Sequence, residues 1–200
     1  MSGRMSAPGA PFTFYFVRHG ITEQNFKGLR CGGDVDVPLM DMGCDQAFLL
    51  AKQILHMDLG IGTIVASSLI RTRQTALIIS GVMGGLPVEV EPLFNERRLG
   101  EWNNRPIEET EDLIRKKVPP PGGETEEQFT ERIGRAVDRV LPLLPRRPLI
   151  VSSKGVGRIL NTILGSEERL LVANGEVVEF TGVAESDGTV SLQIRRPHQF

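Results

Sequence analysis

Residues 12–25 read FTFYFVRHGITEQN, a run of apolar and aromatic residues that ends in arginine, histidine and glycine. A nearly continuous apolar run of this length is typical of a strand that is buried on both faces of a sheet. Arg18, His19 and Gly20 follow at once, so the strand would deliver these residues at its carboxyl end. We therefore expect the functional site at the exit of this strand.

Stretches with strand-like patterns alternate with helix-like stretches along most of the chain. The expected strands after the first are 63–66, 88–90 and 149–151, and the expected helices are 42–56, one that follows Ser68 and carries Ala76, Leu77, Ile79 and Met83, 107–117, one from about 125 to 142, and 156–164. Asp41 is the expected N-cap of the first helix. Residues 93–104 show neither the repeat of a helix nor the alternation of a strand, which favours a loop. The alternation predicts an α/β fold of three α/β/α layers around a mainly parallel sheet.

Two turn signals divide the chain after Gly165. Asn174-Gly175 and Asp187-Gly188 separate three strand-like runs, which predicts antiparallel strands at one edge of the sheet. A length of 200 residues fits one domain with a sizeable core. We expect a flexible tail over residues 1–11 and a single domain over residues 12–200. The apolar hairpins at the sheet edge are compatible with a homodimer.

The composition argues against several classes of protein and site. Hydrophobic residues make up 40% of the chain, charged residues make up 24%, and the net charge is −2, which is typical of a globular protein without bulk affinity for nucleic acid. No stretch is long and apolar enough for a membrane span. Cys31 and Cys44 form no cluster with histidine at metal spacing, so we expect no metal and no disulfide. Free thiols and a first segment without the apolar run of a secretion signal predict a cytoplasmic protein.

Five blocks of the sequence resemble, in order, the signature blocks of the histidine phosphatase superfamily, the phosphoglycerate mutase-like proteins. In the first block Arg18-His19-Gly20 follows the strand, and Thr22 and Asn25 come soon after. The others are SSLIRTRQTA at 67–76, NERRLGEW at 95–102, PGGET at 121–125 with Phe129 and Arg132 after it, and NGEV at 174–177. The similarity covers about residues 12–195 and implies a phosphoglycerate mutase-like fold.

The resemblance also implies a role for each matching residue. His19 would be the nucleophile that accepts phosphate, and Glu96 would be the proton donor. The phosphate would be bound by Arg18, Asn25, Arg71, Ser153 and Lys154, and the substrate pocket would include Gly20, Thr22, Arg97 and Glu124. His56 and His198 receive no role. No metal or organic cofactor is implied, and the partner is a small phosphorylated substrate.

The implied chemistry suits these residue types. A neutral imidazole attacks phosphorus and becomes a phosphohistidine that water hydrolyses, so one hard step becomes two easier ones. Neighbouring guanidinium groups favour the uncharged imidazole and offset the charge on the phosphate oxygens in the transition state. Glu96, when protonated, would protonate the leaving alkoxide and afterwards activate water.

One block departs from the family pattern. The family has a second histidine in a Ser-His-Gly-Gly type of turn, whereas this chain reads Val151-Ser152-Ser153-Lys154-Gly155, so that Ser153 stands at the histidine position. Losing one donor to a developing anion typically costs about a hundred- to a thousandfold in rate. Lys154, at a predicted helix N-terminus, would restore part of the missing positive charge. The alternative is that Lys154 points to solvent.

Three functions remain open at this point. The first is a phosphomonoesterase that acts through phosphohistidine on a small phosphorylated metabolite, with reduced activity as an option. The second is a catalytically impaired relative that binds phosphorylated ligands or partners. The third, ranked lower, is a phosphoglycerate mutase. Retention of His19 and Glu96 together favours the enzyme, because a protein that only binds phosphate has no use for a nucleophile and an acid.

Overall fold

A six-stranded sheet forms the centre of the protein, as the computed structural model shows for residues 11–166, 170–184 and 190–197. The strands are β1 (Pro11–Arg18), β2 (Ile64–Ala66), β3 (Val88–Val90), β4 (Leu149–Ser152), β5 (Val177–Ala184) and β6 (Val190–Arg195). Their order is β3-β2-β4-β1-β5-β6. The first four in this order pair in parallel, and β5 and β6 pair antiparallel at the other edge. The predicted sheet type is therefore confirmed.

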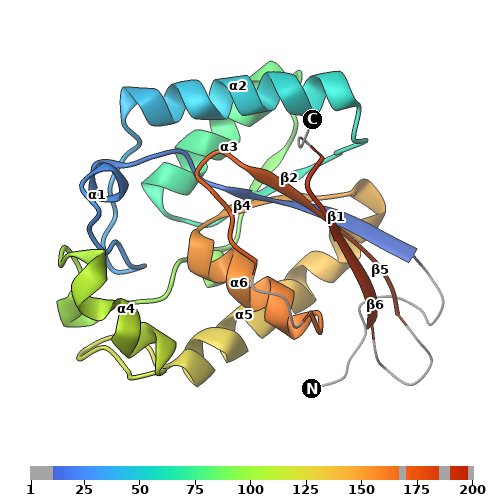
Figure 1. Ribbon diagram of the computed structural model, residues 1–200. Helices are drawn as coiled ribbons and strands as arrows, with labels where there is room; N and C mark the ends of the chain where they lie inside the picture. The colour runs from blue at the N-terminus through green and yellow to red at the C-terminus, as the bar shows by residue number, and fades with distance from the viewer. Residues whose placement is uncertain (1–10, 167–169, 185–189, 198–200) are drawn as a thin grey trace.

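Helices cover both faces of the sheet and complete the three predicted layers (Figure 1). Helices α2 and α3 lie on one face, and α5 and α6 lie on the other. The helices are α1 (Glu23–Phe26), α2 (Asp41–Met57), α3 (Ile70–Val82), α4 (Ile107–Arg115), α5 (Glu126–Val140) and α6 (Lys154–Ile163). Within the described parts of the chain, no helix is long and apolar enough to cross a membrane.

Strand β1 lies at the centre because both of its faces are apolar. Phe12, Phe14 and Phe16 belong to the core cluster on the α5 and α6 side, whereas Tyr15 and Val17 belong to the cluster on the α2 and α3 side. Successive side chains of a strand point to opposite faces, so the unbroken apolar run contributes side chains to the cores on both faces of the sheet. This is the physical reason for the unbroken apolar run at residues 12–17.

Three sequence-based expectations about local structure are wrong. Asp41 is not an N-cap but the first residue of α2, because Met40 has the extended backbone that a cap requires. The Met40 amide donates to the carbonyl of Ile21 at 3.1 Å, which holds Met40 in that conformation. Lys154 and Gly155 are already helical, so the predicted turn before α6 ends at Ser153. By contrast, residues 93–104 form the expected loop, which includes parts of two short 3-10 turns at Pro92–Phe94 and Gly100–Trp102.

The third error concerns the first strand-like run after Gly165. Leu170 and Val172 are buried, but residues 170–173 form no strand. Side chains bind their backbone instead: Arg196 donates to the Leu171 carbonyl, and the Ala173 amide donates to the Glu176 carboxylate. These groups are then not available to a sheet ladder. The Asp187-Gly188 turn and residues 1–10 of the expected tail lie outside the described residues, and Pro11 already belongs to β1.

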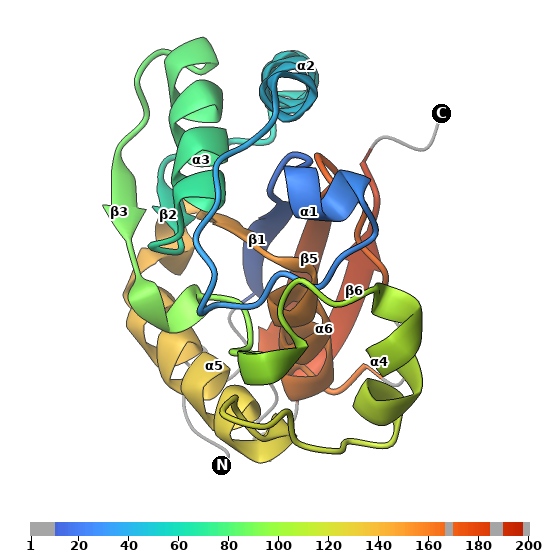
Figure 2. The ribbon, with the colours of Figure 1, turned by 90° about the vertical axis from the view of Figure 1, so that its left-hand side faces the viewer.

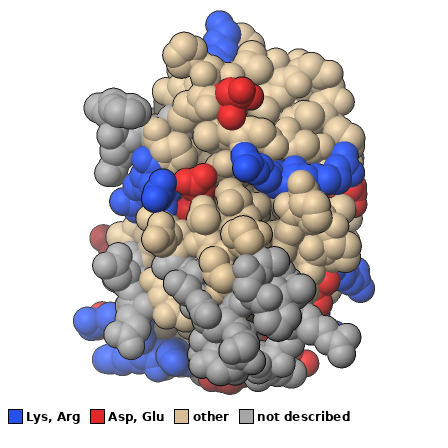
Figure 3. Space-filling model, turned by 90° about the vertical axis from the view of Figure 1, so that its right-hand side faces the viewer, with Lys and Arg blue, Asp and Glu red and all other residues tan. Residues whose placement is uncertain are grey.

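The carboxyl ends of the four parallel strands meet at one end of the molecule. Figure 2 looks onto this end, where α1 and α4 lie in front of the sheet. The opposite end, where β1 begins, carries lysine and arginine side chains in several groups with acidic side chains among them (Figure 3). Parallel sheets usually bind ligands at the carboxyl ends of their strands, so we expect the site at the end that Figure 2 shows.

Candidate active site

His19 lies directly after β1 and is almost completely buried, with 4% of its surface exposed. Its Nδ1 lies 2.7 Å from the carbonyl oxygen of Gly20. A carbonyl can only accept, so in the neutral ring Nδ1 carries the proton and Nε2 keeps a lone pair. The His19 amide donates to the Ser152 carbonyl at 2.9 Å, and Asn174 Nδ2 donates to the His19 carbonyl at 2.8 Å. The backbone and the ring are thus both held in place.

Burial and neighbouring positive charge keep this imidazole neutral. Burial is the main cause that lowers the pKa of His19 well below its ordinary value, and the charges of Arg71 and Arg18 lower it further. The hydrogen bond to Gly20 acts in the opposite direction and is outweighed. A neutral ring with a free Nε2 is the form of histidine that can act as a nucleophile.

A cavity of about 200 Å³ opens beside His19. Six of the residues that the sequence assigned to the site line it: Arg18, His19, Asn25, Glu96, Arg97 and Lys154. Further charged, aliphatic and glycine residues also line the cavity: Leu29, Arg30, Ile107, Glu111, Ile114, Gly155, Arg158, Leu170 and Leu171. Gly20, Thr22, Arg71, Glu124 and Ser153 are not among its lining residues. In the described part of the chain, no group of three or more histidine, cysteine or acidic residues could hold a metal ion.

Arg18 offers a buried donor at this cavity. Its Nη1 donates to the carbonyl of Val172 at 3.2 Å, which anchors the guanidinium to the segment before β5. Its Nε is buried and has no partner within the described residues. Burial is the main cause that lowers the pKa of Arg18, and the charge of Arg71 adds to it, against the opposing effect of Glu96. An anion in the cavity would satisfy both the free donor and the desolvated charge.

Arg71 has a different arrangement from the one expected. It lies in the first turn of α3 with 1% of its surface exposed, and its charge acts on His19. Its Nη1 and Nη2 donate to the carbonyls of Val35 and Gly32, at 2.9 and 3.2 Å. Only Nε lacks a partner among the residues that the structure describes. Arg71 thus holds the 32–35 loop, and its direct contact with phosphate stays a prediction.

Glu96 faces the N-terminus of α6. One carboxylate oxygen accepts the amide of Arg97 at 2.7 Å, and the other accepts the amide of Gly155 at 2.9 Å. A Cβ atom at position 155 would collide with the same carboxylate. Glycine at this position therefore lets the helix backbone approach Glu96 closely enough for the hydrogen bond.

Gly155→Ala should therefore displace the Glu96 carboxylate without unfolding the protein, because the colliding atom is the end of a flexible side chain. If Glu96 transfers protons, kcat for an aryl phosphate should fall about a hundredfold, the lower range for general acid catalysis. Gly134→Ala is the matched control, since a Cβ there meets nothing within 4 Å. Equal kcat values for both variants would contradict the assigned role of Glu96.

Ser153 and Lys154 lie at the start of α6. Ser153 is the N-cap, and its buried Oγ has no partner within the described ranges. Lys154 is exposed and is among the residues that line the cavity, and its contact with phosphate stays a prediction. The amides of a helix N-terminus favour anions, and here they point toward the same end of the sheet as His19.

Gly20 and Thr22 do not line the cavity but stabilise the backbone next to it. A Cβ atom on Gly20 would collide with the carbonyl oxygen of Gly43 in α2, so glycine permits the loop to pack against that helix. Thr22 is buried and caps α1: its hydroxyl accepts the Asn25 amide, and its own amide donates to Asn25 Oδ1. Asn25 lines the cavity and also receives Asn174 Nδ2 at 3.3 Å.

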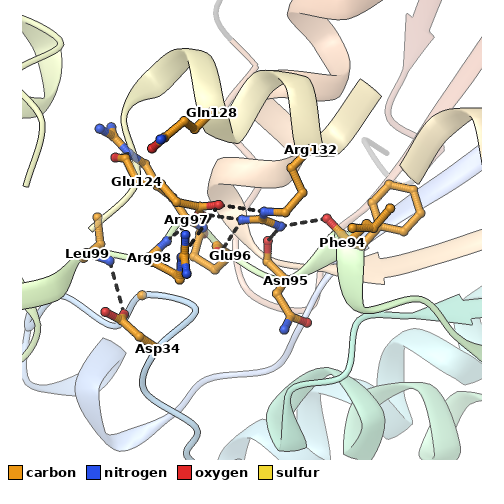
Figure 4. A network of polar contacts seen from close by, with 12 residues as sticks. Asp34, Phe94, Asn95, Glu96, Arg97, Arg98, Leu99, Glu124, Gln128 and Arg132 are labelled. Atoms are coloured by element: carbon orange, nitrogen blue, oxygen red, sulfur yellow. Dashed lines mark hydrogen bonds and ion pairs between the residues drawn. The ribbon is translucent and has the colours of Figure 1, made fainter. Parts of the chain in front are cut away.

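Glu124 supports the loop that carries Glu96 (Figure 4). Its carboxylate accepts Arg132 Nε at 2.8 Å and Nη2 at 2.7 Å, and also the amide of Arg98 at 2.9 Å. Its oxygens are used by the protein, and it lines a second, shallower hollow instead of the cavity beside His19. Arg97 does line that cavity and is anchored by the Glu124 carbonyl and by the Glu126 carboxylate.

The sequence reasoning missed several residues of the cavity. Arg30, Arg158 and the aliphatic side chains of α4 and 170–171 line it, although they belong to none of the family-like blocks. Ile107 and Ile114 are seven residues apart on one helix, a spacing that could have indicated a shared face. For Arg30 the sequence offered no signal. His56 is exposed on α2, and His198 lies outside the described residues.

Comparisons with known proteins agree with this fold and with the family that the sequence blocks resemble. A sequence model of the histidine phosphatase superfamily (branch 1) matches residues 14–182. A Yersinia pestis (strain Pestoides F) protein named "Probable phosphoglycerate mutase GpmB" is 35% identical over 176 residues, 80% of each chain. The solved structure of a mycobacterial glucosyl-3-phosphoglycerate phosphatase has a TM-score of 0.76 at 22% identity, and covers 92% of this chain and 97% of its own.

A phosphoglycerate mutase from Bacillus anthracis str. Sterne has a TM-score of 0.78 at 20% identity and covers 93% of both chains. At these identities the two solved structures show a common fold. The phosphoglycerate mutase-like architecture that the sequence blocks implied is confirmed.

Proposed function

Because this chain belongs to the histidine phosphatase superfamily (branch 1), we propose that it is a phosphomonoesterase that acts through a phosphohistidine at His19. The substrate would be a small phosphorylated metabolite. The observation that carries the proposal is the imidazole: it is buried, it is kept neutral, and its Nδ1 proton is bound to the Gly20 carbonyl. The lone pair of Nε2 is then available to attack phosphorus.

The reaction would proceed in two steps, transfer of the phosphoryl group to His19 and its hydrolysis by water. In the first, Nε2 forms a bond to phosphorus as the bond from phosphorus to the ester oxygen breaks, and Glu96 in its protonated form gives its proton to the leaving oxygen. In the second, water attacks the phosphohistidine and gives a proton to the Glu96 carboxylate. The bond from Nε2 to phosphorus breaks, which restores the neutral imidazole of His19 and releases inorganic phosphate, and the proposed steps use no metal or organic cofactor.

The surrounding groups would stabilise the transferring phosphoryl group. Arg18 supplies a donor without a partner in the described chain, and Arg71 supplies buried positive charge near the ring. The N-terminus of α6 supplies backbone amides, and Lys154 at the cavity wall supplies a further charge. Fixed positive groups of this kind stabilise charge on the equatorial phosphate oxygens.

One observation favours a second candidate, a relative with impaired catalysis that binds phosphorylated ligands. By the order of the sequence blocks, Ser153 would stand where the family has its second histidine, and a hydroxyl replaces an imidazole poorly as a donor to a developing anion. The named relatives make a phosphoglycerate mutase a third candidate. We rank both below the phosphatase because nucleophile and acid are retained together.

The test is steady-state hydrolysis of p-nitrophenyl phosphate, in the presence of a chelator, by the parent and by Ser153→His. We expect measurable turnover by the parent and a gain of up to about a hundredfold in the variant, since one donor to the anion is restored. A parent without turnover beside an active Ser153→His variant would favour the impaired relative. Inactivity of both would contradict the phosphatase proposal.

A further inference from the structure

The cavity beside His19 has an aliphatic wall that the phosphatase chemistry does not use. Five side chains form it: Leu29, Ile107, Ile114, Leu170 and Leu171. They come from three segments, namely the loop after α1, helix α4 and the segment before β5, which meet at the end of the molecule seen in Figure 2. Apolar side chains from separate segments thus contribute to the lining of the cavity beside the nucleophile.

Two members of this wall are exposed to solvent. Ile107 is 38% exposed and Leu171 is 47% exposed. Burying apolar surface is favourable by about 25 cal/mol for each Å² removed from water. A ligand that covers these side chains would therefore gain affinity in proportion to its own apolar area.

The charged groups beside the wall have partners within the protein. Arg30 Nη2 pairs with the Glu111 carboxylate at 2.6 Å, and Arg30 Nε donates to Thr110 Oγ1 at 2.7 Å. Among the other lining residues, Arg97 and Arg158 share the carboxylate of Glu126, and the buried Nη2 of Arg97 has no partner within the described residues. A second anionic group of a ligand placed beside Arg30 would lose water against the aliphatic side chains and would meet a cation that is already paired with Glu111.

We propose that the group esterified to the phosphate in this cavity is apolar, an alkyl or aryl group without a carboxylate. This inference rests on the proposed phosphatase function and gives the substrate class of the same site. The phosphate would lie at Arg18 and His19, and the ester group would lie along the side chains of Leu29, Ile107 and Leu171.

The test uses two matched series, linear alkyl phosphates for hydrolysis and linear alkylphosphonates, which are not hydrolysed, for binding by calorimetry. We expect kcat/KM and affinity to rise about two- to fourfold for each added methylene, as partial to full burial implies. 3-Phosphoglycerate, which carries a carboxylate, should be a poorer ligand than hexylphosphonate. Ile107→Ser and Leu171→Ser should each flatten the dependence on chain length while leaving methylphosphonate binding unchanged.

Leu77→Ser is the matched control, because Leu77 is an exposed leucine on α3 that does not line the cavity. Affinity that does not depend on chain length, or tighter binding of 3-phosphoglycerate than of hexylphosphonate, would overturn the inference. Hydrolysis without the chain-length trend would overturn it and leave the phosphatase proposal standing. The trend in binding without any hydrolysis would support the inference and contradict the phosphatase proposal.

Discussion

Replacing His19 by alanine should lower kcat for p-nitrophenyl phosphate by at least about ten-thousandfold, as the loss of a catalytic nucleophile does in other enzymes. The variant loses Nε2, the atom that would form the bond to phosphorus. Arg18 and the N-terminus of α6 remain, so phosphate should still bind. Steady-state kinetics together with calorimetry of phosphate binding separate these two effects.

Two companion variants make the result specific. His19→Asn can keep a side-chain N–H donor for the Gly20 carbonyl but has no nucleophilic nitrogen, so it should lose as much activity as His19→Ala while retaining more stability. His56→Ala should keep full activity, since His56 is exposed on α2. If His19→Asn kept a tenth or more of the parent rate, His19 would be a structural residue and not the nucleophile.

Replacing Arg132 by methionine should lower the free energy of unfolding by about 3–5 kcal/mol, the usual cost of removing one partner of a buried ion pair. All five N–H donors of an arginine are used here. They reach both oxygens of Glu124 and the carbonyls of Leu93, Asn95 and Glu96, at 2.7 to 3.2 Å (Figure 4). Since these carbonyls belong to the loop that carries Glu96, kcat should also fall, and by more than KM changes.

Urea denaturation measures the predicted loss of stability. Arg139→Met is the matched control: it lies on the same helix and pairs with Glu91, but its side chain is 64% exposed, so it should cost less than about 1 kcal/mol. Adding Glu124→Gln to Arg132→Met should recover part of the loss, because it removes the unpaired buried carboxylate. Equal costs for Arg132→Met and Arg139→Met would show that the Arg132 network contributes little.

The sequence predicts the centre of the fold well because the physical signal there is local. The unbroken apolar run of β1 can be read directly as burial on both faces, and the structure buries it between two cores. Parallel strands share their carboxyl end, which is why His19 after β1 and Lys154 after β4 could be expected in one place. Both residues line the same cavity.

The parts that could not be predicted depend on contacts between distant segments. The run at 170–173 is apolar like a strand, but its backbone is bound by Arg18, Arg196 and Glu176 instead of a neighbouring strand. Glu124 looks like a pocket residue in its sequence block, yet Arg132 and the Arg98 amide occupy its oxygens. Sequence spacing does not show which partner a buried polar group finds.

The assignment of Arg71 shows the same limit within the site. Its position at the start of α3 was foreseen, and its charge acts on His19 as expected. Its two terminal nitrogens, however, bind carbonyls of the 32–35 loop, which has no helical or strand period in the sequence. One guanidinium group therefore provides both the predicted charge effect on His19 and hydrogen bonds that the sequence does not show.

The most direct test of the phosphohistidine is to mix the protein with an aryl phosphate, quench in alkali within the first turnover, and map the phosphorylated peptide by mass spectrometry. We expect phosphate on the peptide that contains His19, and none in the His19→Asn variant. Turnover by the parent with no phosphorylated His19 at any quench time, or phosphate on a different residue, would contradict the account.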